Sequence, residues 1–271
     1  MKGIILAGGT GSRVYPSTTV VSKQLLPVYD KPTIYYPLTT LIKLGITDVM
    51  IITNGLAYSN LLTLFKQTST VKPYLGINFT FKIQTAPKGI AEALIIAEER
   101  QGNDDVCLIL GDNIFTGIKK PNIKYGAGVV SYRVSNPSDY GVIKVNDSGK
   151  VISIEEKPET PLSNDAVTGI YFYDDTAGER ARGLKPSARG EIEITDLNKS
   201  YLKDEELTHT RLFAASMYVK SIQDRTNSMI GCIEGESWEQ GNITEEEFKK
   251  VVEKMPSCSY KTNVAMSYFW G

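Results

Sequence analysis

The chain has 271 residues, of which 41% are hydrophobic and 23% charged, and its 30 basic and 31 acidic residues give a formal net charge of −1. These values are typical of a globular protein with a buried core. No run of Lys or Arg is dense enough to follow a polynucleotide backbone, so we expect no nucleic-acid partner. No apolar stretch is long enough for a signal-peptide core or a membrane span, so we expect a cytoplasmic protein without membrane contact.

The composition also limits the chemistry of the protein. The chain has one histidine, His209, and three widely spaced cysteines, Cys107, Cys232 and Cys258. A Ser-His-Asp triad or a histidine-rich metal site therefore has almost nothing to draw on, and no disulfide framework is implied. Any catalysis must use carboxylates, Lys, Arg, hydroxyl groups and the backbone.

Short apolar or β-branched runs alternate with helical patterns in the first half of the chain. This pattern predicts an α/β fold with a Rossmann-like, mostly parallel sheet flanked by helices. The expected strands cover residues 3–7, 48–53, 78–84 and 106–110, and the expected helices cover residues 33–44 and 90–100.

The middle of the chain changes to strand patterns at residues 127–134, 141–145, 151–155 and 166–173, with a hairpin turn at 146–149. Helical patterns return at residues 194–203, 211–224 and 245–255, and Thr244 with Glu247 predicts a capping box before the last helix. We expect one domain over residues 1–271, made of an α/β part at 1–115, a β-rich insertion at 126–203 and a helical C-terminal part at 211–271.

A glycine-rich loop follows the first expected strand, with the sequence Leu-Ala-Gly-Gly-Thr-Gly-Ser-Arg at residues 6–13. Glycines at this place in an α/β sheet let backbone N–H groups approach a phosphate closely. The loop matches neither the dinucleotide fingerprint nor a P-loop, because Val14 replaces the third glycine and no Gly-Lys-Ser/Thr follows. A tight turn would explain the glycines equally well, but the cations Arg13 and Lys23 just downstream favour a triphosphate site.

Asp112 follows the apolar strand at residues 106–110 and should lie at its carboxyl end, where such sheets bind ligands. It could simply begin a turn with Asn113. Next to a phosphate-binding loop, a carboxylate in a chain almost without histidine favours a hard cation with oxygen ligands, and Mg²⁺ is the cation of that kind that accompanies phosphates.

These residues also carry a family resemblance. The glycine loop, followed by Ser-Lys-Gln-Leu-Leu-Pro-Val-Tyr-Asp-Lys-Pro at residues 22–32, resembles the signature of the glucose-1-phosphate thymidylyltransferases. The resemblance continues through Gln84 and residues 89–93, 111–115, 139–142, 155–158, 166–173 and 185–191. It implies Mg²⁺-dependent nucleotidyl transfer from dTTP to glucose 1-phosphate, giving dTDP-glucose and pyrophosphate, by a homo-oligomer that is a tetramer.

The same resemblance assigns roles to individual residues. It makes Arg13, Lys23 and Asp112 the catalytic residues, with Asp112 as metal ligand. The nucleotide site in the 1–115 part would consist of Gly8, Gly9, Gly11, Arg13, Lys23, Asp112 and, at the pyrimidine edge, Gln84 and Gly89. The sugar-phosphate site in the 126–203 part would consist of Tyr140, Gly141, Glu156 and Val167 around the sugar, and Lys157 and Arg189 at its phosphate.

The chain departs from the family pattern after Leu207. Family members have an Ala-Trp-Leu-Asp-Thr-Gly segment there, whose aspartate is the second metal ligand, whereas here Leu207 runs directly into Thr208. Glu191 and Asp196 are candidate replacements by position in the chain. Two alternatives therefore stay open: a nucleotide-binding pseudoenzyme or regulatory subunit, and a nucleotidyltransferase with another base or hexose preference, since Gln84 alone does not exclude uracil.

Overall fold

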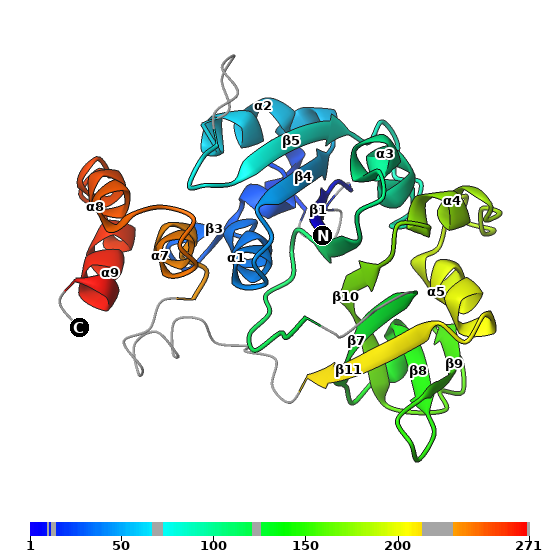
Figure 1. Cartoon of the computed structure of the whole chain (residues 1–271). Helices are drawn as coiled ribbons and strands as arrows, with labels where there is room; N and C mark the ends of the chain where they lie inside the picture. Colours follow the sequence, from blue (N-terminus) through cyan, green and yellow to red (C-terminus); the bar gives the residue numbers. More distant parts are fainter. Residues whose placement is uncertain (10, 12–14, 67–72, 121–125, 213–229, 270–271) are drawn as a thin grey trace.

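The computed structural model describes residues 1–9, 11, 15–66, 73–120, 126–212 and 230–269, and Figure 1 shows how their helices and strands are arranged. A mixed sheet runs through the molecule, and its strands lie in the order β11 (Leu207–Leu212), β7 (Ala127–Arg133), β10 (Asp165–Tyr173), β6 (Val106–Leu110), β1 (Lys2–Ala7), β4 (Asp48–Thr53) and β5 (Asn78–Ile83). A short separate hairpin is formed by β2 (Pro27–Val28) and β3 (Lys31–Pro32). Single 3-10 turns lie at Ser17–Thr19, Lys23–Leu25 and Pro137–Asp139.

Four parallel strands form one half of this sheet: β1 (Lys2–Ala7), β4 (Asp48–Thr53), β5 (Asn78–Ile83) and β6 (Val106–Leu110). They are joined through α1 (Tyr35–Lys43), α2 (Gly55–Leu64) and α3 (Glu92–Gln101). The expected strands here are confirmed to within one residue. The order of connection reverses between β1 and β6, and ligands bind outside the carboxyl ends of strands at such a point.

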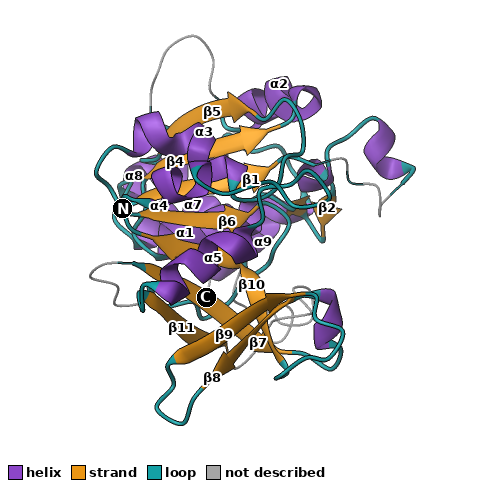
Figure 2. Cartoon of the chain, turned by 90° about the vertical axis from the view of Figure 1, so that its right-hand side faces the viewer, coloured by secondary structure: helices purple, strands orange, loops and turns teal. Residues whose placement is uncertain are grey.

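The other half of the sheet is built around β10 (Asp165–Tyr173), which pairs antiparallel with β6 and with β7 (Ala127–Arg133). The hairpin of β8 (Gly141–Val145) and β9 (Val151–Glu156) extends from β10. Figure 2 shows these strands grouped below the parallel ones. The predicted α/β fold with a central parallel sheet, flanking helices and a β-rich insertion is confirmed.

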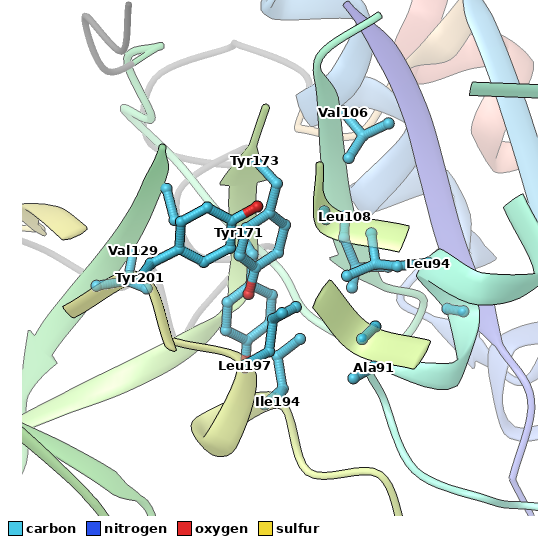
Figure 3. Close-up of a cluster of buried hydrophobic side chains, with 14 of the residues drawn as sticks. Ala91, Leu94, Val106, Leu108, Val129, Tyr171, Tyr173, Ile194, Leu197 and Tyr201 are labelled. Atoms are coloured by element: carbon cyan, nitrogen blue, oxygen red, sulfur yellow. The ribbon is translucent and has the colours of Figure 1, made fainter. Parts of the chain in front are cut away.

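Apolar side chains on both faces of the parallel strands explain why these strands appear as continuous hydrophobic runs. Ile4 of β1 faces a core with α3, α4 (Ala177–Arg182) and α5 (Ile194–Lys203), while its neighbour Ile5 faces a core with α1, α2 and α7 (Ile233–Glu239). In the first core the rings of Tyr171, Tyr173 and Tyr201 pack together beside Leu94 and Leu108 (Figure 3). This packing joins the two halves of the sheet.

Helices α8 (Glu245–Glu253) and α9 (Ser259–Tyr268) lie far from the β-rich half of the molecule (Figure 1). The predicted capping box at the start of α8 is confirmed: the Thr244 hydroxyl accepts from the Glu247 N–H at 3.2 Å, and the Glu247 carboxylate accepts from the Thr244 N–H at 2.8 Å. Within the described residues, no helix is both long and apolar enough to cross a membrane.

The prediction of a helix at residues 211–224 is wrong for its first two residues. Arg211 and Leu212 end a strand, β11 (Leu207–Leu212), which pairs in parallel with β7, and residues 213–229 lie outside the described residues. Tertiary pairing with the open edge of β7 decides the structure here, because the local pattern of this segment is only weakly apolar. The junction expected between Leu207 and Thr208 therefore falls inside a paired strand.

Candidate active site

A cleft of about 460 Å³ opens at the carboxyl ends of the parallel strands. It is bounded on its other side by β8, β9, β10 and the start of α5. The predicted site residues that line it are Gly8, Gly9, Gln84, Gly89, Asp112, Tyr140, Gly141, Glu156, Lys157, Val167 and Arg189. The fold thus brings residues from both halves of the sheet to one cavity.

The loop after β1 is held open by polar side chains from neighbouring elements. Asn54, which caps α2, donates its side-chain amide to the Gly9 carbonyl at 3.1 Å, and Gln24 donates to the Gly8 carbonyl at 3.4 Å. Gly9 has a φ of +97°, a conformation that favours glycine. A Cβ on Gly8 would lie 2.8 Å from Oε1 of Gln84, so a side chain at this position would displace the Gln84 amide.

Of the predicted phosphate site, the described residues Gly11 and Lys23 are not among those that line the cleft. Gly11 has a φ of +62° and its carbonyl accepts from the Thr18 hydroxyl at 2.9 Å, so it shapes the turn beyond the cleft wall. Arg13 lies outside the described residues, and its role stays a prediction. Lys23 reaches the cleft through its ion pair with Asp112.

That ion pair joins Lys23 Nζ to Asp112 Oδ2 at 2.6 Å, with the two side chains 39% and 26% exposed. In the amide orientation that satisfies both of its partners, Asn113 donates to Asp112 Oδ1 at 3.1 Å and accepts from the Gly169 N–H at 3.2 Å. The carboxylate at the end of β6 is therefore fixed by one cation and one amide while it still faces water.

The acidic side chains of the cleft supply few metal ligands. Among the described residues, no three His, Cys, Asp or Glu side chains lie close enough together to hold a metal ion. Mg²⁺ commonly takes one or two carboxylates and completes its shell with substrate phosphates and water, so Asp112 alone fits a metal that arrives with a nucleotide. Glu191 lines the cleft, whereas Asp196 is outside the lining and pairs with Lys199 at 3.1 Å.

Gln84 follows β5 and is buried, with 7% of its surface exposed. Its backbone N–H donates to the Thr53 carbonyl at 2.8 Å, and its side-chain NH₂ donates to Glu92 Oε2 at 2.6 Å and to the Gly89 carbonyl at 3.3 Å. Gly89 has a φ of +99°, and a Cβ there would lie 2.4 Å from the Ile192 carbonyl oxygen. Glycine at position 89 is thus required by its positive φ and by the close approach of the Ile192 backbone.

The β-rich side of the cleft presents a carboxylate and a cation next to each other in sequence. Glu156 Oε2 accepts from the hydroxyl of Thr195, the second residue of α5, at 2.5 Å. A Cβ on Gly141 would lie 3.2 Å from that hydroxyl and 3.3 Å from Glu156 Oε2, so Gly141 packs directly against this pair. Lys157 has a φ of +44° and its N–H donates to the Tyr140 carbonyl at 2.9 Å; its exposed ammonium forms no ion pair with the carboxylates that the structure describes.

Arg189 is paired with acidic neighbours on the same loop. Its Nη2 lies 2.9 Å from Glu193 Oε1 and 3.5 Å from Glu191 Oε2. The hydrogen bond to Glu193 and the nearby carboxylates raise the pKa of Arg189 above its ordinary value. The Ser187 hydroxyl donates to the same oxygen of Glu193 at 2.7 Å. The guanidinium is half-exposed at the cleft rim, so an incoming anion can compete with Glu193 for it.

Sequence reasoning missed some residues that shape the cleft. Gln24 is inside the family signature but carried no separate signal, because a glutamine in a loop has no characteristic chemistry. Thr195 and Glu193 stand at the start of the helix expected at 194–203, shortly after Arg189, and that proximity could have indicated them. Asn54 precedes α2, a helix that the apolar pattern did not reveal.

The cleft therefore combines a glycine-walled loop, ammonium and guanidinium groups, and carboxylates, without a histidine or cysteine among its described lining residues. Such a site suits reactions of phosphate esters that proceed by positioning and charge neutralisation.

The profile of the nucleotidyl transferase family matches residues 2–239. A glucose-1-phosphate thymidylyltransferase of Neisseria meningitidis is 44% identical over 282 residues, and one of Mycolicibacterium smegmatis is 41% identical over 281, each alignment covering 96% of both chains. A Bacillus anthracis protein assigned as a glucose-1-phosphate thymidylyltransferase, solved with sucrose, superposes with a TM-score of 0.71 at 45% identity over 78% of this chain and 87% of that one. A UDP-glucose pyrophosphorylase in complex with UDP-glucose superposes with a TM-score of 0.68 at 25% identity, over 92% of this chain and 98% of that one. The chain thus belongs to the nucleotidyl transferase family.

Proposed function

We propose that this protein transfers the thymidylyl group of dTTP to glucose 1-phosphate. The observation that carries the proposal is that one cleft brings Gly8, Gln84 and Asp112 together with Glu156 and the cations of the β-rich side. The relatives that are 41–44% identical over nearly the whole chain are glucose-1-phosphate thymidylyltransferases, which supports these two substrates.

The chemistry requires no general base. A phosphate monoester has a second pKa of about 6, so the phosphate of glucose 1-phosphate is already ionised at neutral pH. One of its oxygens forms a bond to the α-phosphorus of dTTP as the bond to the β-phosphate oxygen breaks and pyrophosphate leaves. The barrier is the repulsion between two anions, which cations at fixed positions lower.

Lys23 and Asp112 act at the triphosphate in this proposal. Asp112 would hold Mg²⁺, which when bound neutralises phosphate charge. Lys23 would then exchange Asp112 for a phosphate oxygen, since its ion pair is open to water. Arg13, at the end of the glycine-rich sequence, would add a second cation.

The sugar phosphate would occupy the β-rich side. Glu156 and Thr195 offer an acceptor and a hydroxyl to the sugar, next to Tyr140, Gly141 and Val167. Lys157 would bind the sugar phosphate directly, and Arg189 would do so by releasing Glu193. The two cations would hold the nucleophile in line with the α-phosphorus.

The test is pyrophosphate release from a panel of dTTP, UTP and dCTP with glucose, galactose and mannose 1-phosphates in the presence of Mg²⁺. We expect dTTP with glucose 1-phosphate to give the highest kcat/KM. A higher value for another pair would assign a different base or hexose. Nucleotide binding without pyrophosphate release from any pair would instead identify a pseudoenzyme or regulatory subunit.

We further propose that the missing Trp-Leu-Asp-Thr-Gly segment slows turnover without weakening nucleotide binding. Removal of one contact that fixes transition-state charge commonly costs about 10²–10³ in rate. The segment should be grafted between Leu207 and Thr208, where the family pattern has it. We expect the graft to raise the Mg²⁺-dependent rate while the calorimetric affinity for dTTP stays constant. A native rate equal to that of the Neisseria relative, with no gain from the graft, would refute this.

We also propose a homo-oligomer, a tetramer by family resemblance. Light scattering should then give about four times the monomer mass of 29.9 kDa. A monomer mass at micromolar concentration would contradict the proposal.

A further inference from the structure

The side-chain amide of Gln84 has an unusual environment, because both groups that face its nitrogen can only accept hydrogen bonds. Glu92 Oε2 lies 2.6 Å from Nε2, and the Gly89 carbonyl lies 3.3 Å from it. An ionised carboxylate and a backbone carbonyl have no proton to donate. If the amide were turned over, its oxygen would face two acceptors in a buried position, which is strongly unfavourable.

The fold places the Glu92 carboxylate against the Gln84 amide. Glu92 is the first residue of α3, and its Oε2 accepts from Gln84 Nε2 at 2.6 Å. It is half-buried behind Gln84, and the ion pairs found in the described residues do not include it. Gln84 is thus the hydrogen-bond donor that the structure supplies to this carboxylate.

The orientation of the amide nitrogen also sets the direction of the amide oxygen, Oε1. With its nitrogen held by Glu92, Gln84 directs Oε1 toward Gly8, where a Cβ would lie 2.8 Å from it. Gly8 and Gln84 both line the cleft, and none of the described groups donates a hydrogen bond to Oε1. The cleft therefore presents a fixed acceptor to whatever base occupies it.

We infer that Glu92 is a positioning residue that fixes the Gln84 amide as an acceptor and thereby selects pyrimidines with an N3–H over cytosine. This inference rests on the proposed function, in which Gln84 contacts the base. Thymine and uracil donate from N3, whereas cytosine carries a lone pair there that would face Oε1. A site built to bond one such group rejects the analogue that lacks it, because a buried polar atom is left without a partner.

The test is the isosteric variant Glu92→Gln, whose amide can accept or donate and so lets Gln84 turn over. Glu99→Gln, with the same charge change at an exposed position on the same helix, is the matched control. We expect the ratio of dTTP to dCTP affinity, measured by calorimetry with Mg²⁺, to fall roughly tenfold to a hundredfold in Glu92→Gln, the range for a hydrogen bond to a charged group. The control and the melting temperature should not change.

Steady-state kinetics of the same proteins separate positioning from a merely structural role. In Glu92→Gln we expect KM for dTTP to rise with kcat nearly constant, and KM for dCTP to fall, since a turned amide can donate to cytosine N3. Loss of affinity for both nucleotides by the same factor, or an unchanged ratio, would overturn the inference. A parent protein that prefers dTTP in calorimetry but makes no product would refute the proposed function alone, because the binding ratio still tests Glu92.

Discussion

Two Lys–Asp ion pairs, each with its lysine in the segment of residues 22–32, have the same length but differ in their exposure to water. The pair of Lys23 with Asp112 lies at the cleft with side chains 39% and 26% exposed, while that of Lys31 with Asp30 is sealed, with 1% and 2% exposed; both measure 2.6 Å. The residue types are identical, so their chemistry does not distinguish them. Access to water does: only the first pair can exchange partners with an anion or a metal ion.

The sealed pair ties the N-terminal segment to the C-terminal helices. Lys31 donates to the Ile230 carbonyl at 3.0 Å, and its ammonium lies 5.4 Å from the ring centre of Tyr260. Asp30 accepts from Asn263 of α9 at 2.8 Å. A buried charge of this kind is tolerated only with its partners in place. The pair therefore supports the fold, whereas the open pair is available for catalysis.

The largest expected effect is a difference in the free energy of unfolding between variants of the two ion pairs. Lys31→Met would leave Asp30 buried without its cation, which commonly costs about 3–5 kcal/mol. Lys23→Met, the same substitution in the open pair, should cost about 0–1 kcal/mol because water and ions screen that pair. Urea unfolding followed by circular dichroism gives both free energies. Equal losses in the two variants would show that burial does not distinguish the pairs.

The second effect separates them by activity. Asp112→Ala should abolish Mg²⁺-dependent pyrophosphate release, a loss of at least about 10²-fold, because it removes the proposed metal ligand. Its urea midpoint should match that of the parent, since Asp112 faces the cleft. An unchanged rate in this variant would eliminate the metal assignment.

The third effect divides the cations of the cleft between the two substrates. Arg189→Ala should raise KM for glucose 1-phosphate by about tenfold, and Arg13→Ala should raise KM for dTTP by a similar factor, because each would lose a charge-assisted hydrogen bond to phosphate. Initial rates with one substrate varied and the other saturating give both constants. If both substitutions affect the same substrate, the division of roles is wrong.

The smallest effect concerns pH and the surroundings of the sealed pair. Burial raises the pKa of Glu234, whose carboxylate accepts from the Tyr260 hydroxyl at 2.5 Å. A raised folded-state pKa gives stability that is complete below the unfolded pKa and is lost as pH rises toward the folded one. Glu234→Gln has no such loss, so its free energy of unfolding relative to the parent should increase from about pH 5 to about pH 7. A difference that is constant or decreases with pH would contradict this.

The parts of the fold that were predictable are those with strong local signals. The strands β1, β4 and β6 are uninterrupted apolar runs bounded by polar or glycine residues, and the Thr244 capping box is a local motif. By contrast, α2 begins at a glycine and α7 contains Gly235, which lets the Tyr268 ring approach closely. Long-range pairing created β11, and no local pattern reports that.

The candidate site can be divided in the same way, into features that the sequence could predict and features that depend on packing in space. Three residues that the family resemblance assigned to the nucleotide site, Gly8, Gln84 and Asp112, line one cleft, because the signature records which strand ends carry ligand-binding residues. The resemblance could not show that the Gln84 amide donates to Glu92 or that Arg189 pairs with Glu193, since these contacts depend on how loops pack in space. The individual roles of the site residues and the division of the domain into three parts stay predictions.

The most direct measurement of the central claim is ³¹P NMR of dTTP, glucose 1-phosphate and Mg²⁺ incubated with the parent protein, with Asp112→Ala and with Lys23→Met. With the parent protein, we expect the triphosphate and monoester signals to be replaced by those of dTDP-glucose and pyrophosphate in equal amounts. Both variants should remain folded and show this conversion slowed or absent. Inorganic phosphate as the product, or no conversion by the parent, would contradict nucleotidyl transfer in this cleft.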